Sequence, residues 1–391
     1  MKKLFVLVTI LTMAYFCQAQ ELNIIEQDYE KALYIARKEN KLIFINFYTG
    51  WCAPCKKLDR LVFQNDSIQQ LLGKEFVLLR YDAENDKVFN LSKKHHISSY
   101  PTAIILNPEG YVLTKQYGFQ GEDFDRLSEN VLKFTGQGIV AYREHNVLKG
   151  YANTIDISMY PQFYIDYVNR DNIKVTNTPE FKAYWKSSVN RTSEAYFSTL
   201  IYFGSDVPDF VADTTLLYKK DYLDLYGVTD TETLFYFLSA AKFGRAISAK
   251  NQEVFDQAEV YAKKALSKAW TDDIIPGFKV TFFKAQNRWD RVFDHYQQRK
   301  DRGQLSHENI SFFCRDVYKN CEDPQVIAQC MDWMQEITAR EPVYDYLDTY
   351  AFLAFKAGNR EKSRKIAELA LAAARKENRK TVKIEELLER L

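Results

Sequence analysis

The sequence predicts an α/β domain with a mixed sheet flanked by helices, followed by a C-terminal all-α domain of helical repeats. Two observations support this fold class. Up to about residue 134, short apolar runs with strand character alternate with helical stretches. Beyond residue 138, long stretches rich in Tyr, Phe, Leu and Ala at helical spacing replace them. A chain of 391 residues also exceeds the usual size of a single domain.

Residues 1–19 have the three zones of a secretory signal peptide. A charged start at 1–3 is followed by an apolar run at 4–11, and Cys17-Gln18-Ala19 ends in a small residue that fits cleavage after Ala19. A lipoprotein signal that uses Cys17 is the alternative, although Phe16 fits it poorly. No later apolar run is long enough for a stable membrane span. We therefore expect an exported, periplasmic protein, with secretion or lipid anchoring as the lesser alternatives.

The charge balance gives no reason to expect a nucleic-acid partner. The chain has 53 basic and 52 acidic residues, and its formal net charge is +1. Binding to nucleic acid or to an anionic membrane usually needs a clear excess of positive charge. Partners must therefore be inferred from specific sites.

The first domain is expected to alternate helices and strands. Tyr29, Ala32 and Ala36 recur at helical spacing, which predicts an amphipathic helix. The turn Asn107-Pro108-Glu109-Gly110 has type I preferences and predicts an antiparallel hairpin. The expected strands are 42–47, 76–81, 102–106 and 111–116, and the expected helices are 28–39, 52–62, 67–72, 87–95 and 122–134.

A dithiol lies where the first of these strands passes into a helix, in Trp51-Cys52-Ala53-Pro54-Cys55. A thiol at a helix N-terminus faces unpaired backbone N–H groups, and these favour its thiolate. Cys52 is therefore the expected nucleophile. Cys55 lies about one helical turn further on and is expected to be the more buried thiol, which resolves a mixed disulfide on Cys52. The two cysteines would form a redox-active disulfide.

This motif, with the lysine that follows it and Tyr100-Pro101-Thr102, resembles the thioredoxin superfamily. The resemblance covers roughly residues 21–138, and within the superfamily the opening FYTGWCAPCKKL looks like the secreted group that includes the C-terminal domain of DsbD-type reductases. It implies a thioredoxin-like fold with no cofactor and no metal. It also implies that Pro101 is a cis-proline and that Tyr100 lies against the dithiol and offers its backbone to an extended substrate. We expect substrate binding by Trp51, Tyr100, Pro101 and Thr102, with Trp51 as an apolar wall beside the nucleophile rather than a core residue.

One position departs from the family pattern. Thioredoxins usually carry a buried acidic residue six positions before the first cysteine, and here that position is Asn46. Because an amide is no general base, proton removal from Cys55 would use water, another group such as Asp82, or proceed more slowly.

His95 and His96 are expected on the surface. Lys56 and Lys57 are expected on a solvated helix face, with a secondary effect on the thiols.

Three further cysteines lie in the C-terminal part: Cys314, Cys321 and Cys330. They allow at most one structural disulfide. A zinc site is not expected, because the three lack close CxxC pairing and His307 is at no standard spacing.

The helical part shows a period from residue 249 onward. Short segments around Lys250, Lys284, Lys319 and Lys356 separate helices, and these lysines are spaced by 34, 35 and 37 residues. This period is close to that of tetratricopeptide repeats, which the copy at 351–374 resembles most, and a generic array of helical pairs is the alternative. The expected domains are 20–138, a helical connecting region at 139–230 and the repeats at 231–391. Helix starts are expected at Thr178-Pro179-Glu180 and at Thr229, in a capping box with Glu232.

These features predict an exported thiol–disulfide oxidoreductase that reduces or isomerises disulfides of protein substrates. Its partners would be protein thiols and disulfides and an upstream membrane-bound or soluble thiol reductant. Ala53-Pro54 do not fix the direction of the reaction. The alternative is a protein-binding scaffold of helical repeats in which the thioredoxin-like domain is mainly a docking module.

Overall fold

A computed structural model describes residues 22–187 and 189–391. The expected signal peptide, with Cys17, lies outside the described residues. The described chain forms two compact units. The first runs up to Ala241 and includes Lys264–Leu266, and the second contains Lys242–Lys263 and Ser267–Leu391.

The first unit is built on a five-stranded mixed sheet in the order β1-β3-β2-β4-β5. β3 pairs in parallel with both β1 and β2, whereas β4 pairs antiparallel with β2 and β5. The mixed sheet and the hairpin at Asn107–Gly110 are as the sequence predicts. The short edge strand β1 was not predicted. The strands are β1 (Asn23–Glu26), β2 (Leu42–Tyr48), β3 (Phe76–Asp82), β4 (Thr102–Leu106) and β5 (Val112–Tyr117).

The helices around the sheet differ from the prediction at three places. The helix expected at 52–62 is α2 followed by a π-helical turn, η1. The helix expected at 87–95 begins only at Leu91, because Asn90 before it has a left-handed φ of 55°. The helix expected to end at 134 continues to Arg143. The elements are α1 (Tyr29–Glu39), α2 (Ala53–Leu58), η1 (Asp59–Phe63), α3 (Asp66–Leu72), η2 (Ala83–Asn85), α4 (Leu91–Lys94) and α5 (Phe124–Arg143).

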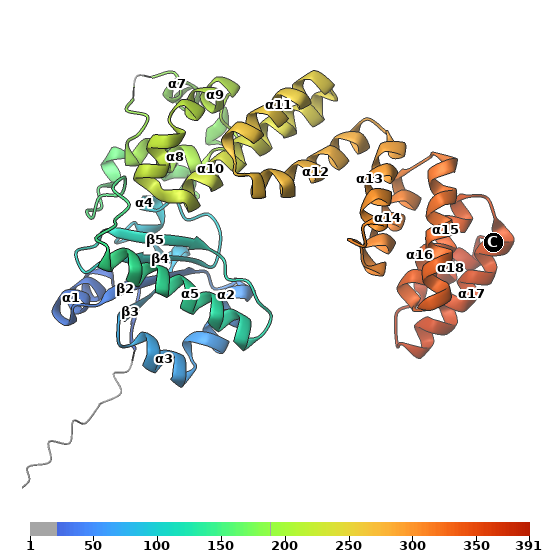
Figure 1. The fold of residues 1–391 in the computed structure, drawn as a ribbon, viewed down its shortest axis with the longest axis horizontal. Helices are drawn as coiled ribbons and strands as arrows, with labels where there is room; N and C mark the ends of the chain where they lie inside the picture. The colour runs from blue at the N-terminus through green and yellow to red at the C-terminus, as the bar shows by residue number, and fades with distance from the viewer. Residues whose placement is uncertain (1–21, 188) are drawn as a thin grey trace, which may run out of the picture. The chain divides into compact units, whose positions relative to one another are not determined.

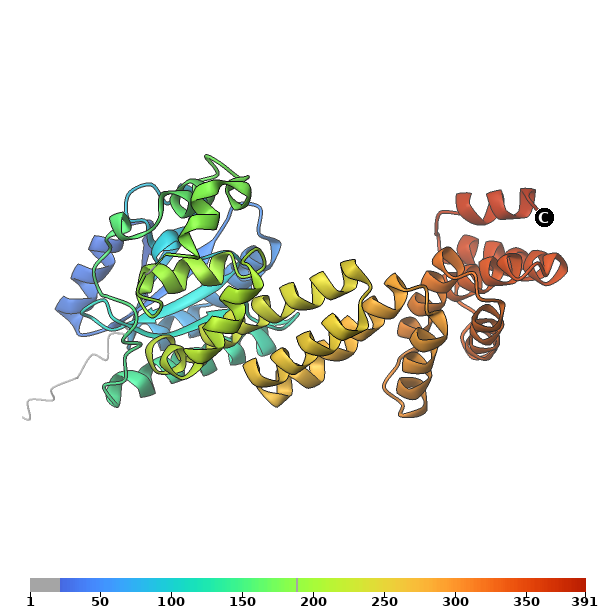
Figure 2. The same cartoon turned by 90° about the horizontal axis from the view of Figure 1, so that it is seen from above.

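The two faces of the sheet are covered by different parts of the chain. Phe44 and Ile105 belong to an apolar core that also contains Leu58 of α2 and Phe134 of α5. Side chains alternate along a strand, so Ile104 of β4 points to the opposite face of the sheet. Its partner on β5, Lys115, points to that face as well. The helices that follow α5 cover this second face on the β5 side (Figures 1 and 2).

Those helices come from the region in which the sequence shows no period. The N-cap of α7 is Thr178, as predicted, and its hydroxyl accepts the Phe181 N–H. The helix start predicted at Thr229 lies within α10, two residues after a break at Gly227, where φ is 77°. The helices are α6 (Gln162–Val168), α7 (Pro179–Tyr184), α8 (Glu194–Tyr202), α9 (Asp209–Leu217) and α10 (Lys219–Ala249), and short 3₁₀ turns lie at η3 (Ile157–Met159) and η4 (Val175–Asn177).

The second unit is all-α, and its helices form pairs at the predicted positions. The segments at Lys250, Asn287 and Gly358 each join two helices through a residue with positive φ. A further turn after Asn320 joins α14 to α15. The helices are α11 (Gln252–Ala265), α12 (Lys268–Ala285), α13 (Trp289–Asp301), α14 (His307–Asn320), α15 (Pro324–Arg340), α16 (Tyr344–Lys356), α17 (Arg360–Lys376) and α18 (Val382–Glu389). The three cysteines of this unit are free thiols in its core, so the possible structural disulfide is not formed.

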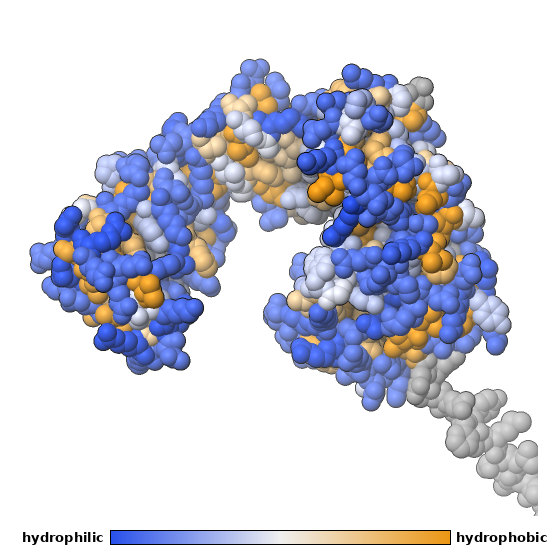
Figure 3. All heavy atoms as spheres, turned by 180° about the vertical axis from the view of Figure 1, so that it is seen from behind, coloured by the Kyte–Doolittle hydropathy of each residue, from blue (hydrophilic) through white to orange (hydrophobic). Residues whose placement is uncertain are grey.

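On the face seen in Figure 3, apolar side chains form separate patches among polar ones. Of the helices in the described ranges 22–187 and 189–391, none has the length and apolar composition needed to cross a membrane.

Candidate active site

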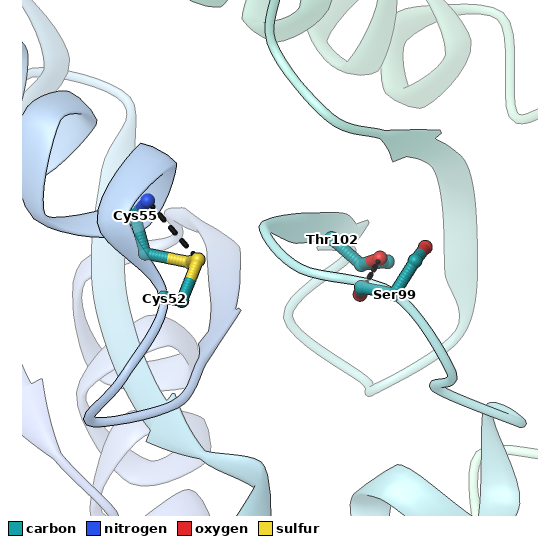
Figure 4. The surroundings of a disulfide bond; sticks show 4 residues. All are labelled: Cys52, Cys55, Ser99 and Thr102. Carbon is teal, nitrogen blue, oxygen red and sulfur yellow. Dashed lines mark hydrogen bonds between the residues drawn. A yellow bond between two sulfur atoms is a disulfide. The ribbon is translucent and has the colours of Figure 1, made fainter. Parts of the chain in front are cut away.

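The dithiol lies at the N-terminus of α2, in the loop that follows β2. Cys52 and Cys55 form a disulfide, with their Cα atoms 5.3 Å apart (Figure 4). Cys52 is the N-cap of α2, and its Sγ accepts a 3.1 Å hydrogen bond from the Cys55 N–H. This N–H would likewise stabilise negative charge on Cys52 Sγ when the disulfide is reduced.

The two cysteines are equally buried in this oxidised form. Cys52 is 3% exposed and Cys55 is 4% exposed. The expected difference in exposure between the two thiols is therefore absent, because the bond holds both sulfur atoms in one place. What distinguishes the two is the position of Cys52 at the N-cap, where the Cys55 N–H points at its sulfur.

Trp51 and Tyr100 bring the two sequence motifs together. Their rings meet edge to face with centroids 5.9 Å apart. Trp51 is 62% exposed, and its Nε1–H donates to Glu84 Oε1 at 3.0 Å. Trp51 is thus an exposed side chain beside Cys52 and not part of the core. Its hydrogen bond to Glu84 fixes the orientation of the ring.

The loop before β4 lies opposite the disulfide (Figure 4). The Tyr100–Pro101 peptide bond is cis, as the resemblance implies. Within the described part of the chain, neither the N–H nor the C=O of Tyr100 has a hydrogen-bond partner. The Thr102 side chain is buried, and its hydroxyl donates to the Ser99 carbonyl at 2.7 Å. Thr102 therefore shapes this loop, and its expected contact with substrate stays a prediction.

Asn46 lies in the middle of β2 and is 2% exposed. Its Oδ1 has no hydrogen-bond partner among the described residues. Asp82, the other candidate proton acceptor, caps η2 and accepts hydrogen bonds from the Glu84 N–H and the Asn85 side chain. Each carboxylate oxygen of Asp82 thus already accepts a hydrogen bond. Lys57 forms an ion pair with Glu122, and Lys56 is exposed, in keeping with a solvated helix face.

The prediction for His95 and His96 is wrong, because both are buried at 2% exposure. Helices that follow α5 cover them. The Nδ1 atom of His96 lies 3.2 Å from Ser198 Oγ of α8, and its Nε2 lies 2.7 Å from Lys115 Nζ. Tyr151 stacks on the ring of His96.

Asp230 of α10 is at the centre of this buried polar cluster. Its carboxylate accepts hydrogen bonds from the hydroxyls of Tyr117 and Tyr151, and it lies 3.2 Å from Lys115 Nζ and 3.4 Å from His96 Nε2. A second ion pair, Lys94 with Glu194 at 2.5 Å, lies beside it. No motif in the sequence indicates this cluster, whose other members are far from His96 in the chain.

Burial and charge shift the titration of these groups. Burial lowers the pKa of His96 to about 4, and lowers that of His95 well below its usual range. Burial also lowers the pKa of Lys115 to about 8. For Asp230 burial acts to raise the pKa, but the charges of Lys115 and His96 outweigh it and hold the pKa far below its usual range. Asp230 is therefore ionised and both histidines are neutral near pH 7.

Known proteins resemble the part of the chain that carries the disulfide. The model of the thioredoxin-like family matches residues 24–108. Thioredoxin-1 of Drosophila melanogaster is 29% identical over 106 residues, which are 27% of this chain and 89% of that protein. The thiol:disulfide interchange protein DsbD of Salmonella typhimurium is 31% identical over 78 residues. These are 19% of this chain and only 14% of DsbD.

Solved structures of thioredoxins also resemble part of this chain. The germline-specific thioredoxin Deadhead of Drosophila melanogaster is 27% identical, with a TM-score of 0.23, and the match covers 29% of this chain and 98% of that chain.

The fold and the disulfide at the head of α2 define a thiol–disulfide oxidoreductase of the thioredoxin type. The match to the model of the thioredoxin-like family is confined to residues 24–108. The remaining helical part lies outside that match. Among the residues with described positions, no group of three or more His, Cys, Asp or Glu side chains is arranged to hold a metal ion.

Proposed function

We propose that the protein is an exported oxidoreductase that reduces or isomerises disulfides of protein substrates through Cys52 and Cys55. The observation that carries this proposal is the Cys52–Cys55 disulfide, with the Cys52 sulfur at the N-cap of α2. The exposed Trp51 and the unpaired backbone of Tyr100 support binding of an extended substrate segment beside the disulfide.

The reaction begins with the reduced dithiol. The Cys52 thiolate attacks one sulfur of the substrate disulfide, that S–S bond breaks, and the first substrate thiolate leaves and takes up a proton. Cys55 then loses its proton and attacks Cys52 Sγ. The mixed disulfide breaks, the second substrate thiolate leaves, and the Cys52–Cys55 disulfide forms. The substrate gains two electrons and two protons. In isomerisation, a substrate thiol attacks the mixed disulfide instead.

Turnover as a reductase needs a thiol donor that returns the Cys52–Cys55 disulfide to the dithiol. We propose a membrane-bound or soluble dithiol protein for this role, because DsbD-type relatives are named for thiol–disulfide interchange. We further propose a periplasmic location, on the signal-like residues 1–19, and a partner-binding role for the helical repeats.

Reduction of insulin by the purified protein with dithiothreitol as electron donor tests the activity. We expect turbidity from the precipitating B chain with the wild-type protein, and loss of this activity in Cys52→Ala. Arg60→Ala, which changes an exposed residue of η1, is the matched control and should remain active. An inactive wild-type protein would contradict the proposal and favour the scaffold alternative.

A further inference from the structure

A cavity of about 440 Å³ lies beside Tyr100 in the first unit. One wall is formed by the segment from Ala83 to Ile97, which includes η2 and α4. The other wall is formed by Val168–Asp171, at the end of α6, and by Tyr202 of α8. The second wall lies outside the segment that matches the thioredoxin-like family.

Two residues connect this cavity to the disulfide loop. Tyr100 lines it and contacts the ring of Trp51, which is next to Cys52. Glu84 also lines it, and its carboxylate accepts the hydrogen bond from Trp51 Nε1. A peptide that lies along Tyr100 would therefore place a side chain next to this cavity.

The inner part of the cavity has hydrogen-bond donors that are not fully used. Ser92 is 3% exposed, and within the described chain its Oγ has no hydrogen-bond partner. Lys93 is also buried, and its Nζ donates to the Asp86 carbonyl at 3.0 Å and to Asn90 Oδ1 at 2.9 Å. Because an ammonium group has three protons, one remains available. A buried hydroxyl without a partner is unfavourable unless a ligand or water bonds to it.

Two of the three carboxylates that line the cavity, Asp86 and Glu84, already accept hydrogen bonds. The Asp86 carboxylate accepts from the N–H groups of Leu91 and Ser92 and from the Tyr81 hydroxyl. Glu84 is engaged by Trp51 and lies 3.7 Å from Arg170 Nη2. The third carboxylate, Asp171, is exposed on the opposite wall. Beside Asp86, the unused donors of Ser92 and Lys93 favour a ligand group that accepts hydrogen bonds.

We infer that the cavity is a specificity subsite for the substrate residue that flanks the target cysteine, and that it takes a side chain ending in an acceptor oxygen, as in Glu or Gln. The Ser92 hydroxyl and the Lys93 ammonium donate to this oxygen, and Arg170 closes the outer wall. The inference rests on the proposed function, because it requires disulfide substrates. In this arrangement α6 and α8 contribute residues to the site that selects the substrate.

Disulfide-linked peptides that differ only in the residue next to the target cysteine test this inference. We expect the wild-type protein to reduce peptides with Glu or Gln there at a kcat/KM several-fold above those with Leu or Lys. Ser92→Ala should lower kcat/KM for the Glu and Gln peptides by about 3- to 10-fold, mainly through KM, since it removes one hydrogen bond. Its fold should persist, because the lost hydroxyl has no partner in the protein.

Two further variants complete the design. Arg170→Ala changes an exposed residue and should lower the preference for Glu and Gln peptides by about 2- to 5-fold through loss of a charge-assisted contact. Ser67→Ala on α3, which lies on the other face of the sheet, is the matched control and should change nothing. Bis(2-hydroxyethyl) disulfide has no flanking residue, so Ser92→Ala should reduce it at the wild-type rate.

The outcomes separate this inference from the proposed function. If the wild-type protein reduces none of the peptides and not the small disulfide, the proposed function is wrong. If it reduces all peptides equally well, or if Ser92→Ala slows all substrates by the same factor, only the subsite is wrong.

Discussion

The Tyr117 hydroxyl donates a 2.6 Å hydrogen bond to Asp230 Oδ1, although 113 residues separate the two in the chain. Tyr117 ends the last strand of the thioredoxin-like sheet, and Asp230 lies in α10. The same carboxylate lies 3.2 Å from Lys115 Nζ. A buried carboxylate thus joins the sheet to a helix that no thioredoxin-like sequence pattern covers.

Asp230→Asn is therefore expected to destabilise the first unit. The variant leaves the buried Lys115 ammonium without its counter-charge, and breaking a buried ion pair in this way usually costs about 3 kcal/mol or more. Hydrogen–deuterium exchange of peptides from β5 should become on the order of 100-fold faster. Asp224→Asn, at an exposed position of the same helix, is the control and should leave this exchange unchanged. Equal exchange in both variants would show that the cluster contributes little stability.

Because His95 and His96 are buried, we expect the stability of the first unit to fall in mild acid. In the folded protein, burial lowers the pKa of His96 to about 4, whereas an unfolded histidine takes up its proton near pH 6.5. Between these values the unfolded state binds more protons, so the free energy of unfolding decreases as the pH falls. The loss between pH 6.5 and pH 5 is roughly 2 kcal/mol for one histidine.

Urea unfolding curves at pH 6.5 and pH 5.0 measure this loss. The second unit contributes equally to the pH dependence in wild type and in His96→Gln, so the comparison isolates His96. The free energy of unfolding should decrease less in the variant than in wild type. A decrease of the same size in both proteins would mean that His96 is not the group that titrates.

Trapping of mixed disulfides tests the roles of the two cysteines. Cys55→Ala should accumulate covalent adducts with substrate proteins, because the resolving thiol is missing, and these adducts should disappear in Cys52→Ala. Mass spectrometry of the adducts identifies the attached sulfur. The assignment of roles would be reversed if trapping required Cys55 and not Cys52.

Asn46→Asp is expected to speed the second step of the reaction. A carboxylate at this buried position can accept the proton of Cys55, which the amide cannot. Because the site offers Asn46 Oδ1 no hydrogen bond, the charge should also cost a few kcal/mol of stability. Stopped-flow measurement of mixed-disulfide resolution between pH 6 and pH 9 provides the comparison. Identical, pH-independent rates in both proteins would refute a limit set by proton removal.

Two glycines of α5 give opposite predictions for the same change. A Cβ added at Gly138 would lie 2.6 Å from Ile105 Cδ1 and 2.9 Å from its Cγ2. Gly138→Ala should therefore destabilise the packing of α5 on β4 by about 1–3 kcal/mol. A Cβ added at Gly136 would have no neighbouring heavy atom within 4 Å. Gly136→Ala should therefore stabilise the helix by up to about 1 kcal/mol. Thermal unfolding of both variants gives the comparison, and a shift in the same direction would contradict it.

The sheet and the disulfide could be predicted because their signals are local. β4 was predicted with its observed bounds, since a continuous apolar run bounded by turn residues specifies a buried strand. Cys52 and Cys55 lie within one short motif, so their spacing alone places them on one turn of helix.

The polar cluster could not be predicted, because its members are far apart in the chain. His96 pairs with Ser198 across 102 residues, and only the folded chain brings α8 over it. In sequence, Lys93-Lys94-His95-His96 has the composition of a solvated surface. The domain boundaries after residues 138 and 230 stay predictions, although the first lies inside α5 and Asp230 packs on the sheet.

The second unit contains Cys314, Cys321 and Cys330 as free thiols deep in its core. Burial raises the pKa of Cys321 to about 11 and that of Cys330 further still, so both stay protonated near neutral pH. Maleimide or iodoacetamide reagents therefore have, within the described residues of the reduced native protein, only Cys52 and Cys55 to modify. A fluorophore or crosslinker can be attached at this pair without mutating the other thiols, provided that the second unit remains folded.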